Sequence, residues 1–582
     1  MLSQGGGGPL PPTPPAAGKS GGGRRKALVA GGVVGILALG GGAFAAYSWF
    51  SGTGPQPAEA LPANTLGYLS LDLDPSGSQK IEAYNTLKKF PAIEQIFDEE
   101  GVEEGTDLRR KLLEEALAED EECSLDYDED IEPWLGERFA VAAISQGEDE
   151  DPAPVFVVQV SDGGAAEETF EKLNECSGDS GGAGWAIDDE WALVAETSEI
   201  AESAAEGAAE ESLADDADFQ KWTSAAGDAG IVQGYASPDV GKELADELAG
   251  LASMGSSMAE IPSAAEVSPA PTGDISECFE LDPVAQSEEF QACIEAAEGA
   301  GATPEPTVPG LPEPDADAIA AIFEDFQGGA MNIRFADGSL EVEVAADGNL
   351  GKQYGLSPSE EGGAAVAALP ADTMVAFGAG FEDGWGQSLI DYYSAFLGEE
   401  FDLEGQIEAL ESQTGLAIPE DVEALLGDSI AVGVSADIDF EGMSGPADAP
   451  VGARITGDPE ETQRVLDKLL EQDPTGMVGE FLGTDSEGDV LAISPNEGYR
   501  EELLGDGGLG DNEVYQDVVR EDAASVFFVN FDAGDGVLDN LLESAGAPGE
   551  VRENAEPLSG LGFTGWLDDD DVAHSVFRMT TD

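Results

Sequence analysis

The chain has 582 residues, of which 121 are acidic and 23 are basic, so its formal net charge at neutral pH is −98. A negative field of this strength repels nucleic acids and anionic lipid headgroups, and we therefore exclude both as direct partners. The acidity is typical of a protein kept soluble in a salty environment, and cation binding is the alternative explanation. The apolar fraction of 41% is enough for sizeable buried cores.

An uncharged stretch spans residues 27–50 and follows three basic residues, Arg24, Arg25 and Lys26. A helix of these 24 residues is about 36 Å long, which exceeds the ~30 Å hydrocarbon core of a bilayer. The basic residues favour a cytoplasmic N-terminus. The sequence therefore predicts one helix over 27–50 that spans the cell membrane once. The acidic remainder of the chain is then extracellular and is anchored by this helix.

The segments that flank this stretch have little apolar periodicity. Residues 1–26 are rich in Gly and Pro, and we expect a disordered cytoplasmic tail there. Residues 51–59 are expected to form a linker. The alternative to an anchor is a cleaved signal peptide, with Ala43-Phe44-Ala45 as its cleavage site. Both alternatives place the rest of the chain outside the cytoplasm.

The part of the chain after residue 59 contains two copies of one unit, because several short motifs recur in the same order. From them we predict a first repeat over 60–350, a linker over 351–367 and a second repeat over 368–582. An insertion in the first repeat, about 249–317, is rich in Pro, Ala and Ser. The matched pairs are Leu61-Pro62-Ala63-Asn64-Thr65 with Leu369-Pro370-Ala371-Asp372-Thr373, Asp130-Ile131-Glu132 with Asp421-Val422-Glu423, and Glu167-Glu168-Thr169 with Glu460-Glu461-Thr462.

Each repeat alternates short strands with helices. Residues 65–73 alternate apolar and polar side chains as a half-buried strand does, and Asp74-Pro75 then begins a helix. The first repeat closes with a hairpin over 330–345, and the second closes with one over 562–579. The predicted fold class is therefore α+β: one N-terminal transmembrane helix, followed by a tandem-duplicated ectodomain of mostly antiparallel sheets with packed helices.

Four cysteines lie in the part predicted to be extracellular. An even number in an oxidising compartment indicates two disulfides, although four cysteines allow three pairings. We favour one bond within the first repeat and one within the insertion, because the second pair falls inside that single segment. These pairs are Cys123 with Cys176, and Cys278 with Cys293.

The chain resembles a family of uncharacterised actinobacterial single-pass envelope proteins, defined only as a domain of unknown function. Besides the basic-flanked apolar stretch, the resemblance rests on the motifs given at the end of this paragraph, and it extends over most of the chain after Ala60. It implies an envelope location and no particular chemistry. The motifs are Ala60-Leu61-Pro62-Ala63-Asn64-Thr65, Leu71-Asp72-Leu73-Asp74-Pro75, Lys89-Phe90-Pro91 and Asp130-Ile131-Glu132-Pro133-Trp134-Leu135-Gly136.

The strongest candidate for chemistry is an acidic cluster in the first repeat. Asp126, Asp128 and Asp130 have the alternating spacing of a calcium-binding loop. An EF-hand is excluded because Ile131 stands where its loop needs Gly. The cluster therefore predicts at most a loose Ca²⁺ or Mg²⁺ site, and the run 568–571 is a weaker candidate, better explained as a solvated turn.

Other motifs point to structure. His574 is the sole histidine and falls in a predicted strand. Gly505, Gly507 and Gly510 match a dinucleotide-binding pattern, but they follow a helix instead of a strand. Trp134 aligns with a leucine in the second repeat, which indicates a core position.

From these observations we predict a non-catalytic binding or scaffolding module of the cell envelope. A small or lipid-like ligand between the two repeats is its expected partner, because paired units commonly leave a cleft. The alternative is a divalent-cation-dependent hydrolase that uses clustered carboxylates.

Overall fold

The computed structural model describes residues 55–73, 77–93, 110, 125–147, 151–177, 182–240, 326–336, 338–349, 358–397, 402–438, 442–443, 445–471, 479, 481–505, 507–534, 542 and 547–582. The chain divides into two compact units. Unit 1 comprises residues 1–88 and 93–215, and unit 2 comprises residues 89–92 and 216–582.

Unit 1 contains a five-stranded antiparallel sheet with the strand order β4-β5-β3-β2-β1. Helix α5 packs beside β4 and β5, where Phe170 contacts the ring of Trp134 edge-on. The strands are β1 (Thr65–Asp72), β2 (Leu135–Ile144), β3 (Ala153–Val160), β4 (Gly184–Asp188) and β5 (Trp191–Ala195); the helices and helical turns are η1 (Pro57–Ala60), α2 (Gly77–Leu87), η2 (Tyr127–Ile131), α5 (Gly163–Ser177), α6 (Ser198–Glu210) and η4 (Leu213–Asp215).

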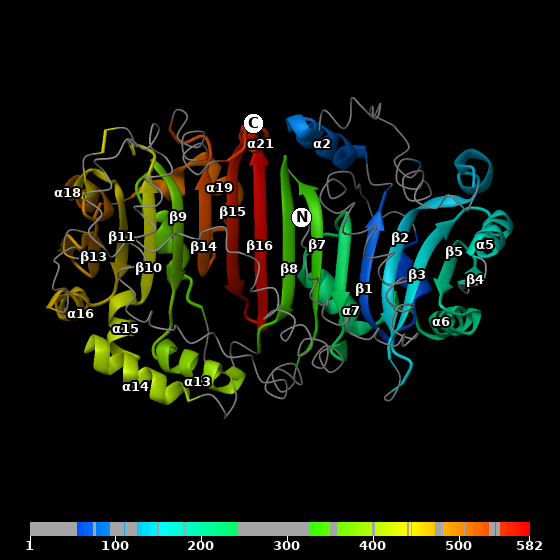
Figure 1. Ribbon diagram of the computed structural model, residues 1–582, viewed down its shortest axis with the longest axis horizontal. Coiled ribbons are helices and arrows are strands. Elements are labelled where there is room, and N and C mark those ends of the chain that lie inside the picture. Colours follow the sequence, from blue (N-terminus) through cyan, green and yellow to red (C-terminus); the bar gives the residue numbers. More distant parts are fainter. Residues whose placement is uncertain are drawn as a thin grey trace, which may run out of the picture. The chain divides into compact units, whose positions relative to one another are not determined.

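Unit 2 contains an eleven-stranded antiparallel sheet in the order β12-β13-β11-β10-β9-β14-β15-β16-β8-β7-β6 (Figure 1). Its strands are β6 (Val232–Ala236), β7 (Gly329–Ala336), β8 (Ser339–Asp347), β9 (Thr373–Gly380), β10 (Ser429–Ser435), β11 (Val451–Thr456), β12 (Thr484–Glu487), β13 (Val490–Ile493), β14 (Ser525–Asn530), β15 (Leu558–Leu567) and β16 (Val572–Thr581). Its helices and helical turns are α7 (Ala217–Ala225), α12 (Glu361–Ala367), α13 (Trp385–Leu397), α14 (Leu403–Thr414), α15 (Glu420–Leu426), η6 (Pro446–Asp448), α16 (Pro459–Glu471), α18 (Glu497–Leu503), η7 (Leu509–Asp511), α19 (Glu513–Val518) and α21 (Gly549–Ala555).

Strand order repeats along the chain. The eight strands β9 to β16 follow the order β12-β13-β11-β10-β9-β14-β15-β16, and the earlier segments β4-β5-β3-β2-β1 and β6-β7-β8 follow it strand for strand. Matched motifs also share local structure. Before β1 the Thr65 hydroxyl donates to the Pro62 carbonyl, and before β9 the Thr373 hydroxyl donates to the Pro370 carbonyl, both at 2.7 Å.

The fold class expected from the sequence is wrong in how it divides the sheets. The sheets do not divide along the predicted repeats, because β8 of the first pairs along its whole length with β16 of the second. Each closing hairpin would otherwise leave an edge of unpaired backbone groups, and this pairing satisfies both. Among the described residues, which do not include 27–50, there is no helix of the length and apolarity that a membrane span needs.

Several predicted segments lie outside the described residues. They are the expected spanning stretch 27–50, the tail 1–26 and the insertion 249–317. The predicted linker 351–367 differs from the structure at its end, where residues 361–367 form α12. Ala365 and Val366 of this helix are buried, so α12 belongs to the core of the second repeat.

Helix α12 lies against β9 and β10 at very short range, which its glycines permit. A Cβ atom on Gly362 would lie 2.0 Å from the carbonyl oxygen of Ala524, so only glycine fits there. This approach lets Val366 and Ala376 contact the same core as Phe528, which is fully buried and meets Tyr515 edge-on at 5.1 Å. The core of unit 2 therefore lies on the face of the sheet that α12 and α19 cover.

We expect Phe528→Ala to lower the free energy of unfolding of unit 2 by about 3–5 kcal/mol, because it leaves a cavity in a closed core. Phe527→Ala is the matched control: this neighbour on β14 points to the other face and is 39% exposed. Its substitution should change stability by about 0.5 kcal/mol or less. Urea denaturation of both variants measures the difference, and equal losses would contradict the assignment of the two faces.

Candidate functional site

The structure gives each residue of the predicted metal cluster a different protein partner. Asp126 caps η2 by accepting a hydrogen bond from the Glu129 amide at 3.1 Å. Asp128 pairs with Arg110, whose hydrogen bond lowers the pKa of that carboxyl. Asp130 pairs with Lys172 of α5. Within the described ranges, no three His, Cys, Asp or Glu side chains converge as a metal site needs.

Asp130 is held between a helix and its own turn. It accepts hydrogen bonds from Lys172 of α5 and, at 2.9 Å, from the Asp126 amide, and both lower its pKa, the first more strongly. A cation at Asp130 would have to displace Lys172. The hypothesis of a Ca²⁺ or Mg²⁺ site here therefore stays a prediction that requires rearranged side chains.

Asp421, the equivalent of Asp130 in the second repeat, has the same arrangement. It is 2% exposed and accepts from the amide four residues before it, that of Ala417, at 2.7 Å. Arg464 and Lys468 of α16 supply the cations. Burial raises the pKa of Asp421, but these three donors outweigh burial and hold it below its usual range. The recurrence indicates that both aspartates fasten a helix to the turn before a strand.

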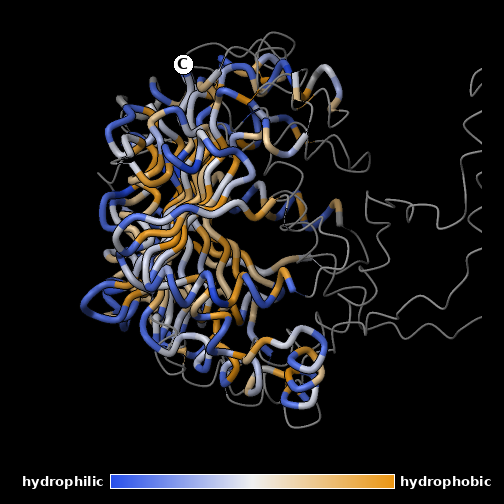
Figure 2. Tube along the Cα trace, turned by 90° about the vertical axis from the view of Figure 1, so that its left-hand side faces the viewer, coloured by the Kyte–Doolittle hydropathy of each residue, from blue (hydrophilic) through white to orange (hydrophobic). Residues whose placement is uncertain are grey.

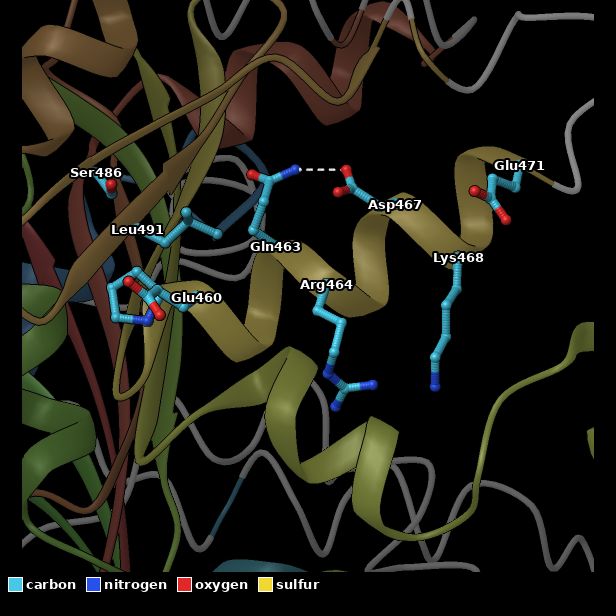
Figure 3. A pocket seen from close by; sticks show the side chains of 9 residues that line it. Glu460, Gln463, Arg464, Asp467, Lys468, Glu471, Ser486 and Leu491 are labelled. Carbon is cyan, nitrogen blue, oxygen red and sulfur yellow. Dashed lines mark hydrogen bonds between the residues drawn. The ribbon is translucent and has the colours of Figure 1, made fainter.

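The hollow beside α16 is an extension of this anchor. It has a volume of about 510 Å³ and is lined by α16 together with Ser486 and Leu491. Figure 3 shows Arg464 and Lys468 leaving the same side of α16, while Gln463 and Asp467 hydrogen-bond each other at 2.9 Å. The two cations of the hollow thus pair with Asp421, and the rest of its lining mixes polar side chains with the apolar Pro459 and Leu491.

The remaining motifs are structural. His574 stacks on Trp566 in the adjacent strand at 4.7 Å, and its Nε2 lies 3.3 Å from Asp568. Asp568 also accepts hydrogen bonds from the Asp570 and Val572 amides at 2.9 Å, so this part of the run 568–571 shapes the β15–β16 turn. Trp134 is buried, and its indole donates to the Asp130 carbonyl at 2.6 Å.

Gly507 belongs to the loop between α18 and η7, and its φ is 75°. A Cβ atom there would lie 2.3 Å from the carbonyl oxygen of Ala368, so the glycine serves packing. The dinucleotide-binding pattern of which it forms part therefore has no nucleotide-binding context in the fold.

The feature most suited to binding is an exposed apolar row on unit 2. Phe377, Phe527 and Phe563 stand directly opposite one another on adjacent strands, and they are 50%, 39% and 42% exposed. The register continues onto β16, β8, β7 and β6. We define the apolar row as Phe377, Phe527, Phe563, Phe577, Val342, Ile333 and Val232, of which the last four are half-buried.

On β8, the side chains on the face of the row are apolar although helices cover the opposite face. An antiparallel sheet covered on one face normally turns its apolar side chains toward that cover and its polar ones to solvent. On β8 the carboxylates Glu341 and Glu343 are buried at 3% and 8% exposure, whereas Val344 is 37% exposed. Arg334 pairs with both buried carboxylates, and Arg578 pairs with Glu341.

Helices of unit 2 cover the face opposite the row. Contacts join α12 to β9, β10 and β14, α19 to β14, β15 and β16, and α7 to β6, β7 and β8. Figure 2 shows hydrophobic segments running through the strands of the sheet. If a fully exposed Phe presents about 200 Å², the three exposed rings contribute roughly 260 Å² of apolar surface. The largest apolar patch on a typical monomer is about 300–600 Å² and is often functional, and the half-buried members of the row add to the area of these three rings.

The amino-acid sequence does not reveal this row. Residues 526–529, Val-Phe-Phe-Val, are apolar at both parities, so periodicity cannot tell which phenylalanine faces the core. The alternation of residues 340–344, Leu-Glu-Val-Glu-Val, was the available signal, but the usual assumption places its apolar side inward.

Asp421→Asn tests the anchor. We expect the free energy of unfolding to fall by about 1–3 kcal/mol at neutral pH, because charge-assisted hydrogen bonds are lost. A carboxyl whose folded pKa is depressed stabilises above its unfolded pKa, and that contribution disappears as the pH falls through the folded pKa. The gap between wild type and variant should therefore narrow below about pH 4.

Glu471→Gln, an exposed position on the same helix, is the control and should stay within about 0.5 kcal/mol of wild type. Urea denaturation from pH 3 to 7 measures both variants. A gap independent of pH would contradict the role of the Asp421 charge.

Comparison with known proteins gives one match. A family model described as "Protein of unknown function (DUF3352)" matches residues 28–181. The match ends before β4, so it includes none of the strands of unit 2 and none of the apolar row. No curated protein and no solved structure matches the chain. Residues 28–181 thus contain a domain of unknown function.

Proposed function

We propose that this protein is a non-catalytic binding module of the cell envelope and that the apolar row is its binding surface. One observation carries the proposal. Three phenylalanines in register, Phe377, Phe527 and Phe563, are 39–50% exposed while their strand neighbours are buried. Apolar surface on that scale is costly to leave in water, about 25 cal/mol per Å², and covering it would favour a partner.

The position of the row agrees with the ligand expected from the sequence. Phe577 of β16 stands opposite Val342 of β8, and this is the strand pair at which the two predicted repeats meet. An apolar or lipid-like ligand on the row would therefore contact strands of both predicted repeats. The row shares no residue with the Asp421 anchor, whose charged groups are committed to holding α16.

An extracytoplasmic location is part of the proposal. Cys176, at the end of α5, is disulfide-bonded, and the other three cysteines of the chain lie outside the described residues. Disulfides persist in oxidising compartments and are rare in the cytosol. The dominance of acidic residues also suits a surface that must stay soluble at high ionic strength.

Binding of the neutral dye Nile red tests the surface. We expect wild-type protein to increase and blue-shift the dye's emission, and the variant Phe377→Ser/Phe527→Ser/Phe563→Ser to lose most of that increase. Phe481→Ser is the control, because Phe481 is 55% exposed at a position outside the row. Circular dichroism checks that all variants are folded, and a triple variant that binds the dye like wild type rules out the row.

The disulfide prediction is tested by thiol mapping. In natively purified protein, we expect a maleimide reagent to leave Cys176 unlabelled until a reductant is added. In Cys176→Ser one new thiol should become reactive, and peptide mapping should identify it as Cys123, the predicted partner. Labelling of Cys278 or Cys293 instead would contradict the predicted pairing.

A further inference from the structure

The length of the apolar row suits a particular kind of partner. The row crosses seven strands, from Phe377 on β9 to Val232 on β6. Strands lie about 4.8 Å apart, so six intervals give about 29 Å. An α-helix of about 20 residues is ~30 Å long. One such helix laid along the row would contact every member of it.

Acidic residues stand at both ends of the strands that carry the phenylalanines. On β9, Phe377 is five residues from Asp372 and five from Glu382, and on β14 Phe527 is five residues from Asp522 and from Asp532. Five residues of strand span about 17 Å. Residues 372–382, 522–532 and 558–568 contain no Lys or Arg. The same spacing separates Phe563 from Asp568 and Phe577 from the C-terminal Asp582.

The acidic groups at one end lie close enough to interact. Burial and, next, the charge of Asp582 raise the pKa of Asp532. Asp372, before β9, and Asp437, after β10, stand at this same end. Burial is the main cause that raises the pKa of Glu502, and the charges of these two aspartates raise it further. Lys89, whose ammonium donates to the Thr581 carbonyl at 3.0 Å, is a cation already at this end. A further cation would relieve the remaining repulsion between the carboxylates.

These charges decide among occupants of the row. A second copy of the chain carries the same net charge of −98 and would bring acidic strand ends against acidic strand ends. An anionic membrane surface is repelled in the same way. A helix is ~10–12 Å wide, so its flanks reach within about 11 Å of the strand ends, close to the screening length of ~10 Å. Basic side chains on those flanks are attracted to both ends.

We infer that the apolar row binds a cationic amphipathic helix of about 20 residues, with its apolar stripe on the phenylalanines and its Lys or Arg side chains toward the acidic strand ends. This inference rests on the proposed function, since it names the partner of the same surface. The bound helix is a protein segment, and lipid is the competing occupant.

The probe is a fluorescein-labelled 20-residue peptide of Leu and Lys with helical amphipathic spacing, titrated into the full chain and followed by anisotropy. We expect the triple Phe→Ser variant to bind it at least about tenfold more weakly than wild type, and Phe481→Ser to bind it like wild type. Raising the salt concentration should weaken binding because the flanking attraction is screened.

Two control peptides separate the row from general charge attraction. A scrambled peptide of the same composition lacks the apolar stripe, and a Leu/Glu peptide keeps the stripe with the opposite charge; both should bind at least about tenfold more weakly than the probe. Equal binding of the scrambled peptide, or no effect of the triple substitution on the probe, overturns the inference.

Neutral phosphatidylcholine vesicles provide the lipid arm. If the protein co-sediments with the vesicles and binds them in preference to the peptide, the inference of a helical partner is overturned, while the row remains the binding surface. Loss of the Nile red response together with unchanged peptide binding also overturns the inference, whereas an unchanged Nile red response in the triple variant overturns the proposed function itself. The two failures are therefore distinguishable.

Discussion

The buried ion pairs of Arg334 with Glu341 and Glu343 determine which side of the unit 2 sheet is covered. Both carboxylates alternate along β8 with apolar residues, so the strand could in principle face either way. A slip of one residue in register would exchange its two faces. On either face, the two carboxylates need water or a cationic partner. In this fold Arg334 and Arg578 pair with them on the face that α7 covers. The apolar side of β8 is left on the open face as a consequence.

This arrangement links the fold to the proposed function. Buried ion pairs are rarely the most stable solution for a core, since well-packed apolar residues of similar volume often do better. Breaking one partner is nevertheless costly, because the other charge stays buried without compensation. The network at the β7–β8–β16 junction therefore opposes any other choice of face or register, because that choice would separate Arg334 from Glu341 and Glu343. The apolar row depends on that choice.

Sequence patterns predicted local structure and internal repetition well. They did not predict which side chains already have partners or which face of the sheet is exposed. The Leu-Pro-Ala motif before Thr65 and Thr373 forms the same turn twice, and the aligned Asp130 and Asp421 fasten helices in the same way. Spacing alone suggested metal ligation at Asp130, because it cannot reveal that a lysine from a distant helix already occupies the carboxylate. The sheet face of Phe527 was equally hidden, since burial depends on which helices cover the sheet.

The two anchors differ in a way that spacing within a helix explains. Lys172 lies three residues after Thr169 on α5, whereas Lys468 lies six residues after the aligned Thr462 on α16. Positions three and six residues after the threonine are themselves three residues apart, which is about one helical turn on the same face. A long side chain at either position can therefore reach the aspartate. The anchor thus constrains the position of a charge in space and leaves its position in the sequence free.

The apolar row shows the complementary case, in which position is kept and size changes. Its members from the second predicted repeat are all phenylalanines, while those from the first are Val342, Ile333 and Val232. The row therefore has an aromatic half and an aliphatic half that meet at the β8–β16 pair. Because the halves differ in the volume they present, a partner laid along the row meets two unlike ends. A helix with large and small apolar side chains at opposite ends would accordingly fit one direction better than the other.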